Sequence, residues 1–161
     1  MTAFRPLTPE WTATLAFFFY SAVVGRHLIL YDGVCGLCNR LNQFVLARDR
    51  QGVFDFAAQQ SVTGHGHLQR FGADPAALTT LYVIADYRTA APQLLGRARA
   101  VLFILGQVGR PWSWLRLFWI VPDGVLNSGY DLVARNRYRL FGQYDSCPMP
   151  TPETRARFID V

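Results

Sequence analysis

Two cysteines beside an expected helix start are the residues of this sequence best suited to chemistry. Cys35 and Cys38 follow a short apolar run, His27–Tyr31, that we interpret as a buried strand. Residues three apart lie on one face of a helix, so their Cα atoms should fall within the roughly 4.4–6.8 Å that a disulfide accepts. The pair is therefore typical of thiol-disulfide exchange.

The position of each cysteine predicts its role. Just before the first helical turn, unpaired backbone N–H groups and the helix dipole favour a thiolate, and thiol pKa values there can fall to roughly 3.5–7.5. Cys38 lines up with Leu41 and Val45 on the apolar side of the expected helix. We therefore expect Cys35 to be exposed and to attack, and Cys38 to be shielded and to resolve the mixed disulfide.

Asp32, three residues before Cys35, is the third candidate catalytic residue. A charged carboxylate close by would oppose thiolate formation, because like charges raise a pKa. It could instead accept a proton from the resolving thiol, or cap the turn through its side chain. Both roles stay open at this point.

A metal site is the competing interpretation of the two cysteines. A structural zinc site needs four ligands, and the other candidates are Cys147, His27, His65 and His67. His65 and His67 have the wrong spacing for a zinc finger and are expected in a glycine-rich loop, while His27 is expected to pack beside the strand. We predict no metal and no bound cofactor. The alternative is a non-enzymatic docking module whose cysteines bind zinc. Cys147 could be a third redox thiol, a structural thiol or a chance residue.

The expected elements alternate in a way that positions the cysteines at the end of a strand. A strand, helix, strand order implies a parallel pair with a right-handed crossover, to which a later hairpin adds two strands. We predict an α/β, thioredoxin-like fold, with a central mixed four-stranded sheet, flanking helices and an added C-terminal helical segment. The expected strands are 27–31, 53–57, 81–85 and 90–95; the expected helices are 37–48, a short one near 68–71, 98–108, and a last helix that is capped by Asp123 and ends at Gly142.

Length and composition bound the remaining possibilities. The chain has 161 residues, of which 51% are hydrophobic and 17% charged, which fits one compact domain and argues against disorder. The net charge is +5 and every cation is arginine, so Schiff-base lysine chemistry is excluded. The cluster of Arg135, Arg137 and Arg139 is expected to be a solvated helix end rather than a nucleic-acid or lipid-headgroup patch.

We place the expected redox domain at residues 27–147, between an extension at 1–26 and a tail at 148–161. One apolar segment lies in the extension and another within the domain. Residues 9–24 predict an amphipathic helix rather than a signal peptide, because acidic Glu10 interrupts the charged region that a signal needs. We therefore expect a cytoplasmic protein. Residues 112–119 are aromatic and are expected to pack into the core, with partner docking as the alternative. Membrane contact through either segment is not favoured, and nothing predicts the oligomeric state.

The residues around the cysteines resemble the DCC family of predicted thiol-disulfide oxidoreductases, named for an Asp-x-x-Cys-x-x-Cys motif. The resemblance continues through Pro111-Trp112 and Phe141-Gly142 and covers about residues 28–147. It implies a thioredoxin-like fold and dithiol exchange with a protein or a low-molecular-weight disulfide or thiol. The matching stretches read Asp32-Gly33-Val34-Cys35-Gly36-Leu37-Cys38 and Tyr130-Asp131-Leu132-Val133-Ala134-Arg135-Asn136-Arg137-Tyr138.

Overall fold

The structure is a computed structural model that describes residues 25–74, 78, 80–109, 111–145 and 150–160. The helix expected at 9–24 and Cys147 lie outside these residues. The strands of the described structure are β1 (His27–Tyr31), β2 (Phe54–Ala58), β3 (Tyr82–Ala85), β4 (Gln93–Gly96) and β5 (Phe158–Ile159). Its described helices are α2 (Gly36–Arg48), α3 (Val62–Arg70), α4 (Arg97–Gln107) and α5 (Asp123–Phe141), with 3-10 helices η2 (Trp112–Ile120) and η3 (Arg155–Arg157).

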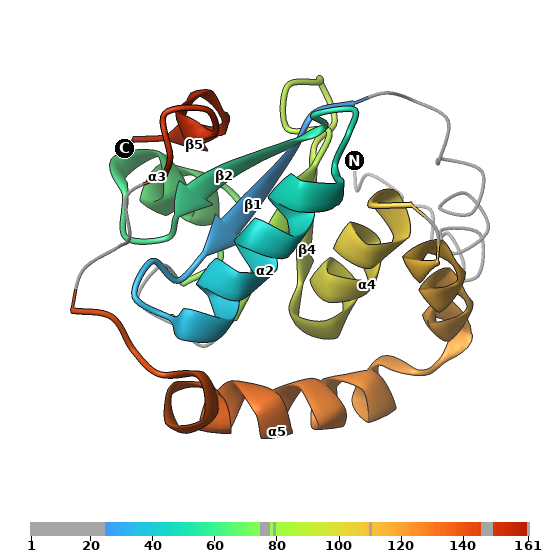
Figure 1. The fold of residues 1–161 in the computed structure, drawn as a ribbon. Coiled ribbons are helices and arrows are strands. Elements are labelled where there is room, and N and C mark those ends of the chain that lie inside the picture. Colours follow the sequence, from blue (N-terminus) through green and yellow to red (C-terminus); the bar gives the residue numbers. More distant parts are fainter. Residues whose placement is uncertain (1–24, 75–77, 79, 110, 146–149, 161) are drawn as a thin grey trace, which may run out of the picture.

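A mixed sheet in the order β4-β3-β1-β2-β5 forms the centre of the described fold (Figure 1). β1 pairs with β2 in parallel, and β3 pairs antiparallel with both β1 and β4. This arrangement of a parallel unit and a hairpin confirms the predicted α/β class and is compatible with a thioredoxin-like fold.

The sheet has five strands among the described residues, so the prediction of four was one too few. The added strand, β5, pairs in parallel with β2 through Phe158 and Ile159. Arg157 fixes it in place, because its Nε donates to the carbonyl oxygen of Phe54 at 2.8 Å and its guanidinium pairs with Asp49. A two-residue strand is too short to produce an alternating pattern, which is why the sequence did not indicate it.

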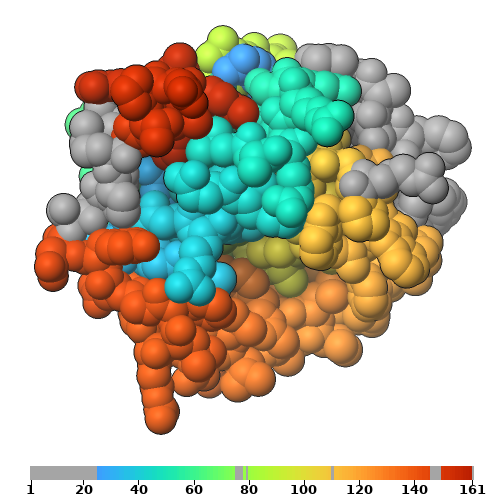
Figure 2. Space-filling model, in the orientation of Figure 1, coloured from blue at the N-terminus to red at the C-terminus, as the bar shows by residue number. Residues whose placement is uncertain are grey.

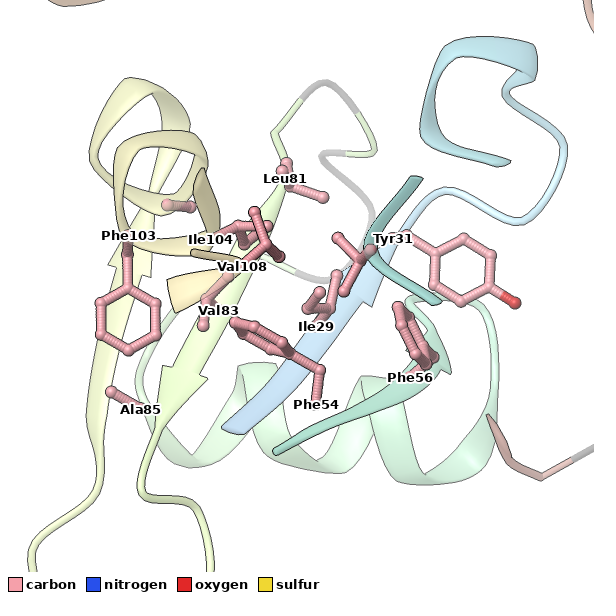
Figure 3. Close-up of a cluster of buried hydrophobic side chains, with 12 residues drawn as sticks. Ile29, Tyr31, Phe54, Phe56, Leu81, Val83, Ala85, Phe103, Ile104 and Val108 are labelled. Carbon is pink, nitrogen blue, oxygen red and sulfur yellow. The ribbon is translucent and has the colours of Figure 1, made fainter. Parts of the chain in front are cut away.

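Successive side chains of each strand point to opposite faces of the sheet. Both faces are apolar, and helices cover each of them. One face buries Ile29, Phe54, Phe56 and Val83 with residues of α2 and α4, and Figure 3 shows these four side chains gathered on one side of the sheet. The opposite face buries a smaller cluster against α3: Leu28, Leu30, Ala57, Leu68 and Ile84. Because β1 is covered on both faces, the turn that follows it has a fixed position.

Several predicted boundaries differ from the structure; β4, for example, begins at Gln93 and not at residue 90. α3 begins six residues earlier than the helix expected near 68, because Ser61 caps it by accepting a hydrogen bond from the backbone N–H of Gly64 at 3.1 Å. His65 and His67 therefore lie on a helix and not in a loop. At α5, Pro122 occupies the cap position, and Asp123 is the first helical residue.

The long helix α5 runs beside one end of the sheet and brings its C-terminus to the start of α2 (Figure 1). The two helix ends make backbone contact, since the N–H of Gly36 donates to the carbonyl oxygen of Gly142 at 3.1 Å. A Cβ atom on Gly36 would lie 2.1 Å from the carbonyl oxygen of Phe141. Glycine at position 36 therefore permits the close approach of α5 to the cysteine pair.

Candidate active site

The cysteine pair lies where β1 passes through a tight turn into α2. Cys35 occupies the cap position of α2, and its backbone N–H donates to the carbonyl oxygen of Asp32 at 3.1 Å. Asn39 holds the turn, because its side-chain amide donates at 3.0 Å to the carbonyl oxygens of both Gly33 and Cys35. The structure thus places the first cysteine at the start of a helix, as the sequence predicted.

The two cysteines differ from the prediction in their exposure. Cys35, expected to be exposed, has 0% of its surface accessible, and Cys38, expected to be shielded, is only partly buried. The reason is residues 142–144, which we call the strap. Gln143 of the strap forms a β-bridge with Cys35, and the Tyr144 N–H donates to the carbonyl oxygen of Val34 at 2.8 Å. The strap follows α5, far along the chain, so no local pattern could reveal it.

The electrostatics assign different protonation states to the two free thiols. The pKa of Cys35 falls to about 6, mainly because the thiol of Cys38 donates a hydrogen bond to its sulfur. Burial opposes this, while the backbone amides of Cys38 and Leu37 and the charge of Arg137 lower the pKa further. The pKa of Cys38 is raised well above its ordinary value, first by that same hydrogen bond and then by burial. Near neutral pH the pair therefore holds a Cys35 thiolate beside a Cys38 thiol.

Arg137 is the residue whose role the sequence interpretation missed. We expected a solvated arginine, but Arg137 is 5% exposed, while Arg135 and Arg139 are exposed as predicted. Its Nη2 donates to Asp32 Oδ2 at 3.1 Å and to the carbonyl oxygen of Leu78 at 2.8 Å. The signal that could have found it is its place in the Asn-Arg-Tyr stretch that carries the family resemblance.

Asp32 is 1% exposed, and both of its carboxylate oxygens accept hydrogen bonds. Oδ1 accepts from the backbone N–H of Val34 at 3.2 Å and from the side-chain amide of Gln60 at 2.8 Å. Oδ2 accepts from Arg137 and from the hydroxyl of Tyr138. The carboxylate therefore ties the turn before Cys35 to the C-terminal half of α5.

The described histidines do not gather near the cysteines in a metal site. His27 packs against the rings of Phe54 and Phe103, and burial lowers its pKa. Within the described part of the chain, no group of three or more His, Cys, Asp or Glu residues could hold a metal ion. Cys147, the remaining candidate ligand, lies outside that part.

The aromatic segment η2 divides between packing and exposure. Trp119 packs against the main core, with the guanidinium of Arg99 over its ring, whereas Trp114 and Phe118 are exposed. Among the helices that the structure describes, none is long and apolar enough to cross a membrane.

Comparisons with known proteins identify the family that this chain resembles. A model of the DCC1-like thiol-disulfide oxidoreductase family matches residues 29–143. An uncharacterized protein of Bacillus subtilis (strain 168), YuxK, is 32% identical over 139 residues, which cover 86% of this chain and 98% of that protein. A protein of Arabidopsis thaliana described as a chloroplastic DCC family protein is 34% identical over 125 residues, or 77% of this chain and 70% of its own. No solved structure matches.

Proposed function

We propose that this chain exchanges disulfides through the dithiol of Cys35 and Cys38. The chain belongs to the DCC1-like thiol-disulfide oxidoreductase family. The observation that carries the proposal is the asymmetry of the pair. The pKa of Cys35 is lowered to about 6 while that of Cys38 is raised, which is the arrangement that an attacking and a resolving thiol require.

The first step would use the Cys35 thiolate as nucleophile. It attacks one sulfur of a substrate disulfide, the substrate S–S bond breaks, and a mixed disulfide forms at Cys35. The second substrate sulfur leaves as a thiolate. Formation of the mixed disulfide removes the charge that had held the proton on Cys38, so the chief cause of the raised pKa of Cys38 disappears at that moment.

The second step would release the substrate. Cys38 gives up its proton to the departed thiolate and attacks the sulfur of Cys35, which forms the Cys35–Cys38 disulfide and expels the second substrate sulfur as a thiolate. In total, two electrons and one proton pass from the protein to the substrate, and the second substrate thiolate takes its proton from the solvent. The reverse reaction follows the same steps, so the reduction potential decides its direction. Because the strap covers Cys35, attack on a substrate requires the strap to move.

We propose a protein or a low-molecular-weight disulfide or thiol as the partner. A cytoplasmic location is proposed from the sequence alone, and one relative is described as chloroplastic.

The test is the rate of disulfide reduction by the reduced protein. Cys35→Ser should abolish the reaction, whereas Cys38→Ser should form the mixed disulfide and stop there, with the substrate thiol detected on Cys35 by mass spectrometry. Cys147→Ser serves as the control that removes a thiol outside the motif. Equal rates for the wild type and Cys35→Ser would refute the proposal.

A further inference from the structure

A cleft of about 440 Å³ opens beside Cys38, between α2, α4 and α5. Figure 2 shows the surface hollowed where the cyan, yellow and orange parts of the chain meet. This volume lies within the roughly 300–1,000 Å³ of small-molecule sites. Cys38 therefore adjoins a space large enough for more than the reacting sulfur atoms of a substrate.

The wall of the cleft is almost entirely apolar. α2, α4 and α5 contribute aliphatic side chains, and the hydroxyl of Tyr130 is engaged as acceptor from the backbone N–H of Leu81 at 2.8 Å. Water held in such a space finds few hydrogen-bond partners, so an apolar group would displace it favourably. The aliphatic residues that line it include Leu37, Leu41, Val101, Leu102, Leu126 and Val133.

One charged side chain, Arg137, interrupts the apolar wall next to the cysteine. Arg137 is more than nine-tenths buried, and its Nε has no hydrogen-bond acceptor among the described residues. A buried N–H without a partner costs free energy, which an acceptor oxygen from a bound molecule would recover. The cleft therefore combines an apolar wall, an unsatisfied donor and a redox sulfur.

We propose that this cleft binds the apolar arm of the substrate: a low-molecular-weight disulfide that carries an aliphatic or aromatic group and an acceptor oxygen near its sulfur. The inference rests on the proposed function and names the substrate class of that site. The apolar arm lies against α4 and α5, the oxygen accepts from Arg137, and the reacting sulfur faces the cysteine pair.

A matched pair of probes tests the apolar arm. N,N′-dibenzoylcystine and N,N′-diacetylcystine share the disulfide and the carboxylates and differ in a phenyl against a methyl group. The reduced wild type should react at least about tenfold faster with the benzoyl compound, since even small apolar differences in a pocket change rates by roughly 10–200-fold. Equal rates for the two compounds would overturn the inference.

Two glycines of α5 supply a matched pair of variants. Gly129 lines the cleft and Gly124 does not, and a Cβ atom on either would meet open space. Gly129→Leu should remove the preference for the benzoyl compound, because the leucine occupies the cleft. Gly124→Leu should retain the preference. A Gly129→Leu variant that keeps the full preference would refute the proposed location.

The same measurements separate the inference from the function on which it rests. If the acetyl compound reacts at a rate that depends on Cys35, but the benzoyl compound reacts no faster, the proposed function stands and the assignment of the cleft is wrong. If neither compound reacts through Cys35, the proposed function and the proposed cleft are both wrong.

A third probe distinguishes a small-molecule substrate from a polypeptide. It is a disulfide-linked peptide dimer with phenylalanine beside its cysteine. A faster reaction with this dimer than with the benzoyl compound would mean that the cleft binds a polypeptide, and our assignment to a small molecule would be wrong.

Discussion

Arg137 Nη2 lies 3.1 Å from Asp32 Oδ2, although 105 residues of chain separate the two side chains. Both are almost fully buried, and Tyr138 donates to the same carboxylate oxygen. The pair joins the turn that precedes Cys35 to the helix that ends at the strap. It also brings a positive charge near the Cys35 sulfur, where that charge lowers the pKa of the thiol.

Arg137→Met should destabilise the protein by roughly 3–5 kcal/mol, because removing one partner of a buried ion pair leaves the other charge unpaired. The pKa of Cys35 should rise in the same variant, since one cause of its lowering is lost. Urea unfolding and thiolate absorbance at 240 nm measure the two effects. The control is Asp32→Asn combined with Arg137→Met, which should recover part of the stability; a double variant less stable than Arg137→Met would contradict the ion-pair account.

The thiolate of Cys35 should form as the pH rises through about 6. Cys38→Ala should shift this midpoint upward, toward the ordinary thiol value of roughly 8.5, because the alanine cannot donate the hydrogen bond that is the largest cause of the lowered pKa. A pH titration of thiolate absorbance gives both midpoints. An unchanged midpoint in Cys38→Ala would show that the backbone and Arg137 set the pKa alone.

The stability of the reduced protein should rise with pH between about 7 and 8.5. In this window the unfolded chain still holds the Cys35 proton, whereas the folded protein, with the pKa lowered to about 6, has released it. Linkage then gives a gain of at most about 1.4 kcal/mol per pH unit. The gain persists above the unfolded pKa and is lost as the pH falls through 6.

Other groups should contribute little within that window. The pKa values of His27 and His67 are lowered in the fold. An unfolded histidine titrates near 6.5, so the contribution of both fades within the first pH unit of the window. The raised pKa of Cys38 acts only where the unfolded thiol ionises, above roughly 8.5. Reduced Cys35→Ser, measured by urea unfolding at the same pH values, should lack the rise, and an equal slope in both proteins would rule out the assignment to Cys35.

The sequence predicted those parts of the fold that depend on local pattern. β1, α2 and the hairpin follow from apolar periodicity and from the turn at Asp32, and the position of Cys35 at the helix start follows from them. The burial of Cys35 and of Arg137 could not be predicted in this way, because both depend on how α5 packs against α2. Contacts between segments about one hundred residues apart leave no periodic signal in either segment.

Gly36→Ala should destabilise the protein by about 1–3 kcal/mol, the usual cost of overpacking, since the added Cβ would lie 2.1 Å from the carbonyl oxygen of Phe141. Gly66→Ala is the matched control within α3, where a Cβ atom meets open space. That variant should gain up to about 1 kcal/mol from helix propensity. Urea unfolding compares the two, and a Gly36→Ala variant as stable as the wild type would mean that the helix ends separate without cost.

Gly142→Val should expose Cys35 by weakening the strap. Gly142 has φ +78° and ψ 169°, a region of backbone conformation that is nearly restricted to glycine and costs other residues of order 1–3 kcal/mol. Release of the strap would relieve that strain, so the open population, and with it the alkylation rate of Cys35, should increase roughly 5- to 150-fold.

Iodoacetamide, applied at one fixed pH to proteins that carry Cys38→Ser and Cys147→Ser, measures Cys35 alone. The control is Gly52→Val, which introduces a valine at φ +65° after α2, away from the strap; its alkylation rate should match that of the parent. Equal acceleration in both variants would show that general destabilisation, rather than the strap, limits access to Cys35.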